Sequence, residues 1–216
     1  YQGLTMSDPS HPGFHLHVET DHQNYSDYKR SINYETGELV VSYKVNEEDY
    51  YKKTFVSQDC NQIIHFLSPG SYKIKLEDYQ HPKMSQLSQV DQKIIHTHFD
   101  YRYSDGGYDV MIEVEAEGIK PLANEIGFEL NSANPVLIRM EILPYRHKSK
   151  RSIIRNKVNL SNEYSRLFTK HTAIHKEMFQ RVELKLARDE ERLQSTWSLV
   201  NKAKERGQIT PVLLEK

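Results

Sequence analysis

Apolar and polar residues alternate along the first two thirds of the chain. In the run FHLHVE, Phe14, Leu16 and Val18 share one face, and the polar residues between them share the other. Successive side chains of a strand point to opposite faces of a sheet, so this period of two predicts strands with one buried and one polar face. The same period continues as far as Ile142.

Turn signals divide this region into short runs. ETGE carries Gly37, which can adopt a positive φ, and predicts the loop of a hairpin; NEED (residues 46–49) and SDGG (residues 104–107) predict further turns. No helical pattern interrupts the runs, which argues against a parallel β/α fold. We therefore predict a mainly β fold, an antiparallel β-sandwich of the supersandwich type. The predicted strands are FHLHVE, residues 28–34, ELVVSYKV, YYKKTFVS, IIHFL, SYKIKLE, KIIHTHFDYRY, YDVMIEVEAE, EIGFEL and VLIRMEI.

After Ser161 the apolar period lengthens to about 3.6 residues, the period of an α-helix. Ser161 is a suitable N-cap residue for this helix. The apolar stripe that would face a core is made of Tyr164, Leu167, Phe168, Ile174, Met178, Phe179 and Val182.

A second helix is predicted over about Glu190–Lys204. It would present Leu193, Trp197 and Val200 on one side, and Gly207 would end it.

The last residues, ITPVLLEK, are typical of the start of a further helix. Thr210 is expected to cap it and Pro211 to occupy its first position. A single helical turn is not stable alone, so we expect more helical structure after Lys216. The predicted organisation is a sandwich domain (1–144), a basic connector (145–160) and a helical linker (161–216).

Composition narrows the classes of partner. The 216 residues carry a formal net charge of -1, and no apolar stretch approaches the roughly 20 residues that cross a bilayer. We expect neither a nucleic-acid nor a membrane partner. Cys60 is the one cysteine, so an intramolecular disulfide is excluded, and its position in a predicted turn favours an incidental role. Extracellular, periplasmic and cytoplasmic locations all stay open.

Histidine pairs on two predicted strands could chelate a metal ion. His15 and His17 share one polar face and His96 and His98 share another, and a third ligand such as Glu19 or Asp100 would have to converge. Solvent-facing polar positions are the favoured interpretation.

His171 and His175 have a spacing that can bind zinc, but the residue after His171 is Thr172, where a zinc protease has its catalytic glutamate. We assign no metal site and no cofactor.

A row of carboxylates suggests sugar chemistry, because glycosidases use paired carboxylates. Glu113, Glu115 and Glu117, with Asp109 before them, fall on one face of a predicted strand. A solvated strand face is the preferred interpretation. No Ser-His-Asp arrangement, phosphate loop or nucleotide fingerprint is present, so we assign no catalytic residue.

Basic residues over Arg146–Lys157 could contact a phosphate or an acidic sugar, but a solvated linker is preferred. Exposed tyrosines could stack on sugar rings, although the alternation directs many of the 14 tyrosines to the core. We assign no carbohydrate-binding residue.

Two segments carry a family resemblance. Residues 26–67 contain SDYKR, then YYKKTFVS, then QIIHFL, and residues 162–186 contain a helix with HTAIHKEMFQRVELKL. Together they resemble the N-terminal domain and linker helix of glycoside hydrolase family 95, the α-L-fucosidase family; His175 departs from the tyrosine usual there. The positions that match are Ser26, Asp27, Tyr28, Arg30, Thr36, Tyr43, Tyr51, Phe55, Ser57, Gln62, Ile63, Ile64, Leu67, His171, Phe179, Arg181, Val182, Leu184 and Leu186.

The resemblance implies a sandwich, a helical linker and then a catalytic (α/α)6 barrel after Lys216. The barrel would carry the catalytic groups, so no catalytic residue transfers to this chain, which alone is expected to be inactive. The intact protein would hydrolyse terminal fucosyl or related glycosidic bonds in a carbohydrate, and the sandwich would buttress the barrel. A free-standing carbohydrate-binding module and a structural or interaction domain remain as alternatives.

Overall fold

The computed structural model describes residues 13–78, 84–101, 104–147, 164–181 and 194–215. Contacts define two compact units, residues 1–175 and residues 176–216. The predicted basic connector and the predicted cap Ser161 lie almost entirely outside the described residues, so the domain limits at residues 144 and 160 stay predictions.

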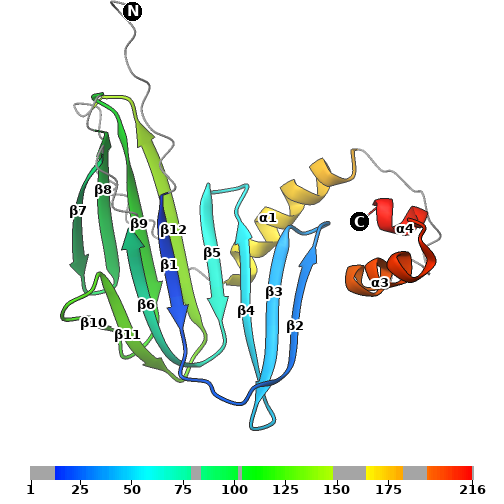
Figure 1. The fold of residues 1–216 in the computed structure, drawn as a ribbon. Helices are drawn as coiled ribbons and strands as arrows, with labels where there is room; N and C mark the ends of the chain where they lie inside the picture. Colours follow the sequence, from blue (N-terminus) through cyan, green and yellow to red (C-terminus); the bar gives the residue numbers. More distant parts are fainter. Residues whose placement is uncertain (1–12, 79–83, 102–103, 148–163, 182–193, 216) are drawn as a thin grey trace, which may run out of the picture. The chain divides into compact units, whose positions relative to one another are not determined.

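The described strands of the first unit form two antiparallel sheets (Figure 1). The four-stranded sheet has the order β1 (Phe14–Glu19), β6 (Gly70–Asp78), β11 (Gly127–Ser132) and β10 (Lys120–Pro121). The eight-stranded sheet has the order β2 (Ser26–Asn33), β3 (Glu38–Val45), β4 (Glu48–Val56), β5 (Gln62–Leu67), β12 (Val136–Tyr145), β9 (Gly107–Glu115), β8 (Ile94–Tyr101) and β7 (Met84–Asp91).

The core between the sheets confirms the predicted sandwich. The apolar faces of β6 and β11 meet those of β8, β9 and β12, and the predicted inward residues of β1 pack at the edge. Its fully buried members, all of them on strands, are Ile74, Ile95, Val110, Ile112, Val114, Phe128, Val136 and Ile138. Because alternate side chains leave the core, each strand also presents a polar outer row.

Two turns form at the positions that the sequence predicts. Gly37 adopts φ 64° between β2 and β3, as the hairpin loop requires. Asn46 and Glu47 join β3 to β4 with φ values of 51° and 65°, the positive pair of a two-residue hairpin.

The strand β7 was not predicted. Its apolar residues Met84, Leu87 and Val90 are three apart, so they show no period of two. It becomes a strand through eight register pairs with β8. Pairing with a neighbour, which the local sequence does not encode, here decides the structure.

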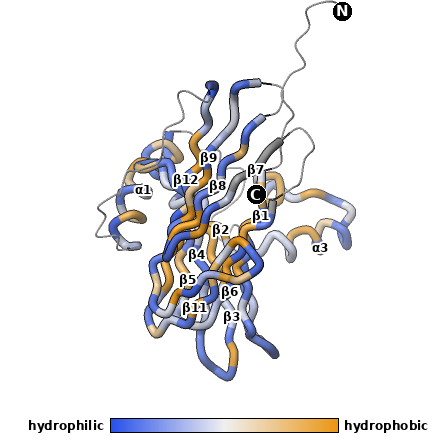
Figure 2. The backbone as a smooth tube through the Cα atoms, turned by 90° about the vertical axis from the view of Figure 1, so that its left-hand side faces the viewer, coloured by the Kyte–Doolittle hydropathy of each residue, from blue (hydrophilic) through white to orange (hydrophobic). Residues whose placement is uncertain are grey.

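The helix α1 (Tyr164–Phe179) begins against the outer face of the eight-stranded sheet. In Figure 2, α1 and β1 lie on opposite sides of β12. The contacts are made by Tyr164, Leu167 and Phe168 with Phe55 and Ile64. The eight-stranded sheet is therefore apolar on both faces in this region.

The predicted apolar stripe is correct for the first part of α1 and wrong for the second. Ile174, Met178 and Phe179 are exposed, while His171 is 1% exposed. The polar imidazole takes the core-facing position because backbone groups of the sheet region supply hydrogen bonds to it, as described below.

The second unit contains α3 (Thr196–Arg206) and α4 (Pro211–Glu215). Ser195 caps α3 by accepting from Ser198 N, and Gly207 ends it at φ 67°, as predicted. Leu199 is the buried residue of α3, and Trp197, predicted on the apolar side, is exposed. Pro211 opens α4 as predicted, but the hydroxyl of Thr210 is buried without a hydrogen bond, so it provides no side-chain cap.

None of the described helices is both long enough and apolar enough to cross a bilayer.

Candidate functional site

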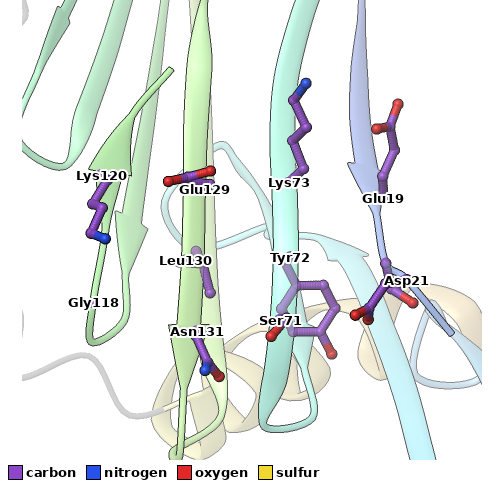
Figure 3. A pocket seen from close by; sticks show the side chains of 11 residues that line it. Glu19, Asp21, Ser71, Tyr72, Lys73, Gly118, Lys120, Glu129, Leu130 and Asn131 are labelled. Carbon is purple, nitrogen blue, oxygen red and sulfur yellow. The ribbon is translucent and has the colours of Figure 1, made fainter. Parts of the chain in front are cut away.

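The four-stranded sheet carries an open cavity of about 480 Å³ (Figure 3). Four of its charged residues are consecutive register partners across the sheet, in the order Lys120, Glu129, Lys73 and Glu19. The surface therefore alternates in charge along this row. The full lining is Glu19, Thr20, Asp21, Ser71, Tyr72, Lys73, Gly118, Lys120, Glu129, Leu130 and Asn131.

Two charged residues of this cavity form ion pairs with residues outside its lining. Lys73 pairs with Glu125, and Lys75 lies 2.7 Å from Glu19. The hydrogen bond from Lys73 lowers the pKa of Glu125, and the hydrogen bond to Glu19 raises the pKa of Lys75. Both groups stay charged at neutral pH, so Glu125 has no proton to donate as a general acid there.

Tyr72, an aromatic residue of the lining, does not offer a stacking surface for a sugar. It is buried, and its hydroxyl donates to the carbonyl of Ser68 at 2.8 Å. Burial raises the pKa of Tyr72 to about 12, so the phenol stays neutral. Neither these ion pairs nor Tyr72 gives the cavity a proton donor or a sugar-stacking ring.

The acidic row of β9 is only partly the solvated face that the sequence predicts. Glu115 and Glu117 are exposed, but Asp109 is 1% exposed and receives a hydrogen bond from His98. The prediction was wrong for Asp109 because the neighbouring strand β8 places an imidazole directly opposite it.

Sequence reasoning also missed Arg139 on β12. This residue is 6% exposed, and its Nη2 atom lies 2.9 Å from Glu113 and 3.7 Å from Glu115. The row of carboxylates thus neutralises a buried guanidinium, which is a structural role. The signal in the sequence is a single arginine inside the apolar run VLIRMEI.

The two strand histidine pairs do approach carboxylates, but not those proposed from the sequence. His15 and His17 lie near Glu77, and His96 and His98 lie near Asp109. Glu19 instead pairs with Lys75, and Asp100 accepts a hydrogen bond from Tyr145. Register across the sheet, rather than spacing along one strand, selects the third group.

The helical histidines anchor α1. His171 Nε2 donates to the carbonyl of Thr36 at 2.8 Å, and its Nδ1 accepts from the backbone N–H of Gln58 at 3.3 Å. Its ring also stacks on Phe55, with 4.7 Å between ring centroids. His175 donates to the carbonyl of Tyr34 at 2.9 Å. These are structural bonds to the β2–β3 loop and to the turn after β4.

Aromatic rings complete this contact, which we call the α1 anchor (Phe55, Phe66, Tyr164, Phe168 and His171). Tyr164 stacks on Phe66 at 4.3 Å, and its hydroxyl donates to the carboxylate of Glu38. Burial and the Glu38 carboxylate raise the pKa of the Tyr164 phenol, so it remains a donor. Cys60, in the turn beside the anchor, is half-buried, and its thiol lies 3.6 Å from the side chain of Gln62.

We predict a pH dependence of stability that originates in His171. Desolvation lowers its pKa in the folded protein, and the nearby His175 adds to this. The unfolded chain, with a histidine pKa of about 6.5, then binds the proton more readily. The contribution is fully present above pH 6.5 or so and is lost as the pH falls below that value.

The measurement is urea unfolding at pH 7.5 and pH 5.5 for the unmodified chain and for His171→Gln. The loss of stability at the lower pH should be smaller in the variant. His65, whose pKa is also lowered by desolvation, contributes equally to both proteins. An identical pH dependence in the two proteins would contradict the assignment.

A solved structure shares the fold of this chain. A structure described as "Putative kojibiose phosphorylase from human microbiome" matches with a TM-score of 0.57 and 11% sequence identity. The match covers 76% of this chain and 27% of that chain, so this chain spans about a quarter of its length. At this identity the likeness establishes a common fold. No protein-family profile matches the sequence, and no curated protein does.

Proposed function

We propose that the chain is the non-catalytic β-sandwich region of a carbohydrate-active enzyme and that it supports a catalytic domain made by other residues of the intact protein. The observation that carries the proposal is the fold likeness, in which most of this chain matches a minor part of a chain named as a disaccharide phosphorylase. A region that forms about a quarter of an enzyme can be a supporting domain.

The contacts of the described carboxylates favour a non-catalytic role for the sandwich. Glu113 and Glu115 face the buried Arg139, and Asp109 is hydrogen-bonded to His98. A glycosidase needs one carboxylic acid kept protonated beside a carboxylate or an activated water. These three carboxylates are engaged by Arg139 and His98 within the sheet and are not arranged as such a pair.

The α1 anchor supports a linker role for the helical segment. Its ring contacts and hydrogen bonds attach the helix to the loops of the eight-stranded sheet over more than 100 residues of sequence separation. The attachment of α1 fixes the place at which the chain leaves the eight-stranded sheet.

The finer proposal concerns the reaction. The resemblance to family 95 favours hydrolysis of terminal fucosyl or related bonds by an inverting mechanism, with a glutamate of the (α/α)6 barrel as general acid and an activated water as nucleophile. The name of the structural neighbour, a kojibiose phosphorylase, suggests phosphorolysis as the competing reaction. In both cases the sandwich buttresses the barrel and takes no part in proton transfer.

The test uses the complete product of the natural gene. We expect the reading frame to continue after Lys216 with several hundred residues of helical pattern, and the product to release nitrophenol from an aryl α-L-fucoside or galactoside without phosphate. Phosphate-dependent consumption of kojibiose would show that the intact protein is a phosphorylase and not a hydrolase. A reading frame that stops soon after Lys216 would overturn the supporting-domain proposal.

A second candidate is a free-standing carbohydrate-binding module. The observation that favours it is a group of exposed tyrosines near the β2 edge strand: Tyr25, Tyr28 and Tyr34, with the rings of Tyr25 and Tyr28 5.9 Å apart. Exposed rings can stack on sugars. A glycan array probed with the isolated chain separates the candidates, because specific binding that is lost in Tyr28→Ala supports the module.

A further inference from the structure

Three potential metal ligands meet on the outer face of β8 and β9. His96 and His98 are two residues apart on β8, and Asp109 is the register partner of His98 on β9. The two imidazole rings have centroids 4.2 Å apart, and His98 donates a hydrogen bond to Asp109. One ligand atom from each residue lies within 4.8 Å of the others.

The donor set is suited to a transition metal. Two imidazole nitrogens and one carboxylate oxygen match the ligands of a zinc site that leaves its fourth position to water. Ligand atoms about 2.1 Å from a tetrahedral zinc ion are separated by about 3.4 Å. Small side-chain rotations from the observed separation would therefore bring the three atoms into a coordination shell, with no change in the sheet.

The surroundings favour a cation. Asp109 is 1% exposed, so its negative charge is poorly solvated. His96 faces the uncharged Gln89 and Met111 on the neighbouring strands, so these two neighbours bring no positive charge to the cluster. Asp100 follows on the same face of β8 and adds negative charge nearby.

The second cluster, His15, His17 and Glu77, lacks these advantages. The side chain of Glu77 is 69% exposed, so water competes for its oxygens. Lys75 is the register partner of His17 and places an ammonium group on the same face. This cluster has the same residue types and a comparable spacing, which makes it a matched control.

We propose that His96, His98 and Asp109 form a binding site for a divalent transition-metal ion, with zinc as its occupant. The ion takes the place of the hydrogen bond between His98 and Asp109, and the His98 imidazole keeps its single proton on the ring nitrogen that does not bind the ion. By joining β8 to β9 through side chains, the ion stabilises the end of the eight-stranded sheet. The site is independent of the proposed carbohydrate function.

The experiment is calorimetric titration of zinc chloride into the untagged chain after removal of metal with a chelator. We expect one equivalent of zinc to bind and to raise Tm. His96→Gln should weaken this binding by at least about tenfold, whereas His17→Gln should leave it unchanged. Far-ultraviolet circular dichroism checks that both variants are folded.

Cobalt(II) supplies a readout that needs no variant. An intense visible spectrum, typical of four-coordinate cobalt, supports the site in the unmodified protein. The proposal is overturned if the chain binds no zinc, if cobalt gives only the weak spectrum of its hydrated ion, or if His17→Gln abolishes binding that His96→Gln retains.

Discussion

Replacing His171 with alanine should lower the free energy of unfolding by about 3 kcal/mol. The side chain is 1% exposed, stacks on Phe55 and bonds to backbone groups of Thr36 and Gln58. Alanine removes the ring from a packed site and leaves a carbonyl and an N–H group without their partners. Urea unfolding followed by circular dichroism measures the change.

His175→Ala is the matched control. His175 lies one turn further along α1 and also bonds to a loop carbonyl, but it is more exposed. Water can replace its hydrogen bond, so the loss should stay below about 1 kcal/mol. Equal losses in the two variants would show that His171 is not the centre of the α1 anchor.

Replacing Phe99 with alanine should cost about 4 kcal/mol. Phe99 is 1% exposed in the core between the sheets, and its ring stacks on Tyr108 at 4.7 Å and on Phe14 at 6.1 Å. The substitution removes apolar area and leaves a cavity that rigid strands cannot close. The same unfolding measurement applies.

The control for Phe99 is an aromatic residue outside the core. Tyr28→Ala removes a comparable ring from the exposed strand β2 and should change stability by no more than about 0.5 kcal/mol. If Phe99→Ala were as mild as Tyr28→Ala, the two sheets would not share the packed core that defines the sandwich.

The sandwich could be predicted because its strands alternate strongly. Val110, Ile112 and Val114 are apolar at every second position, and all three are fully buried. β7 could not be predicted, because its residues give no such pattern and its structure depends on pairing with β8. Local sequence predicts a strand only where one face must be buried.

The polar contacts were less predictable. His171 falls on the same helical face as Tyr164 and Leu167, so its core-facing position could be found from spacing. Its partners Thr36 and Gln58 are more than 100 residues away and become visible only in the fold. The burial of Asp109 likewise follows from the register of β9 with β8, which no single strand reveals.

The central claim is that this chain supports a carbohydrate-active enzyme without performing its chemistry. Its most direct test is turnover by the purified chain, residues 1–216, with aryl α-L-fucoside and α- and β-galactoside substrates at high protein concentration. We expect no release of nitrophenol above the buffer rate from this chain, while the complete gene product is active. Turnover by the chain alone that disappears in Glu113→Gln would show that the sandwich itself performs the chemistry.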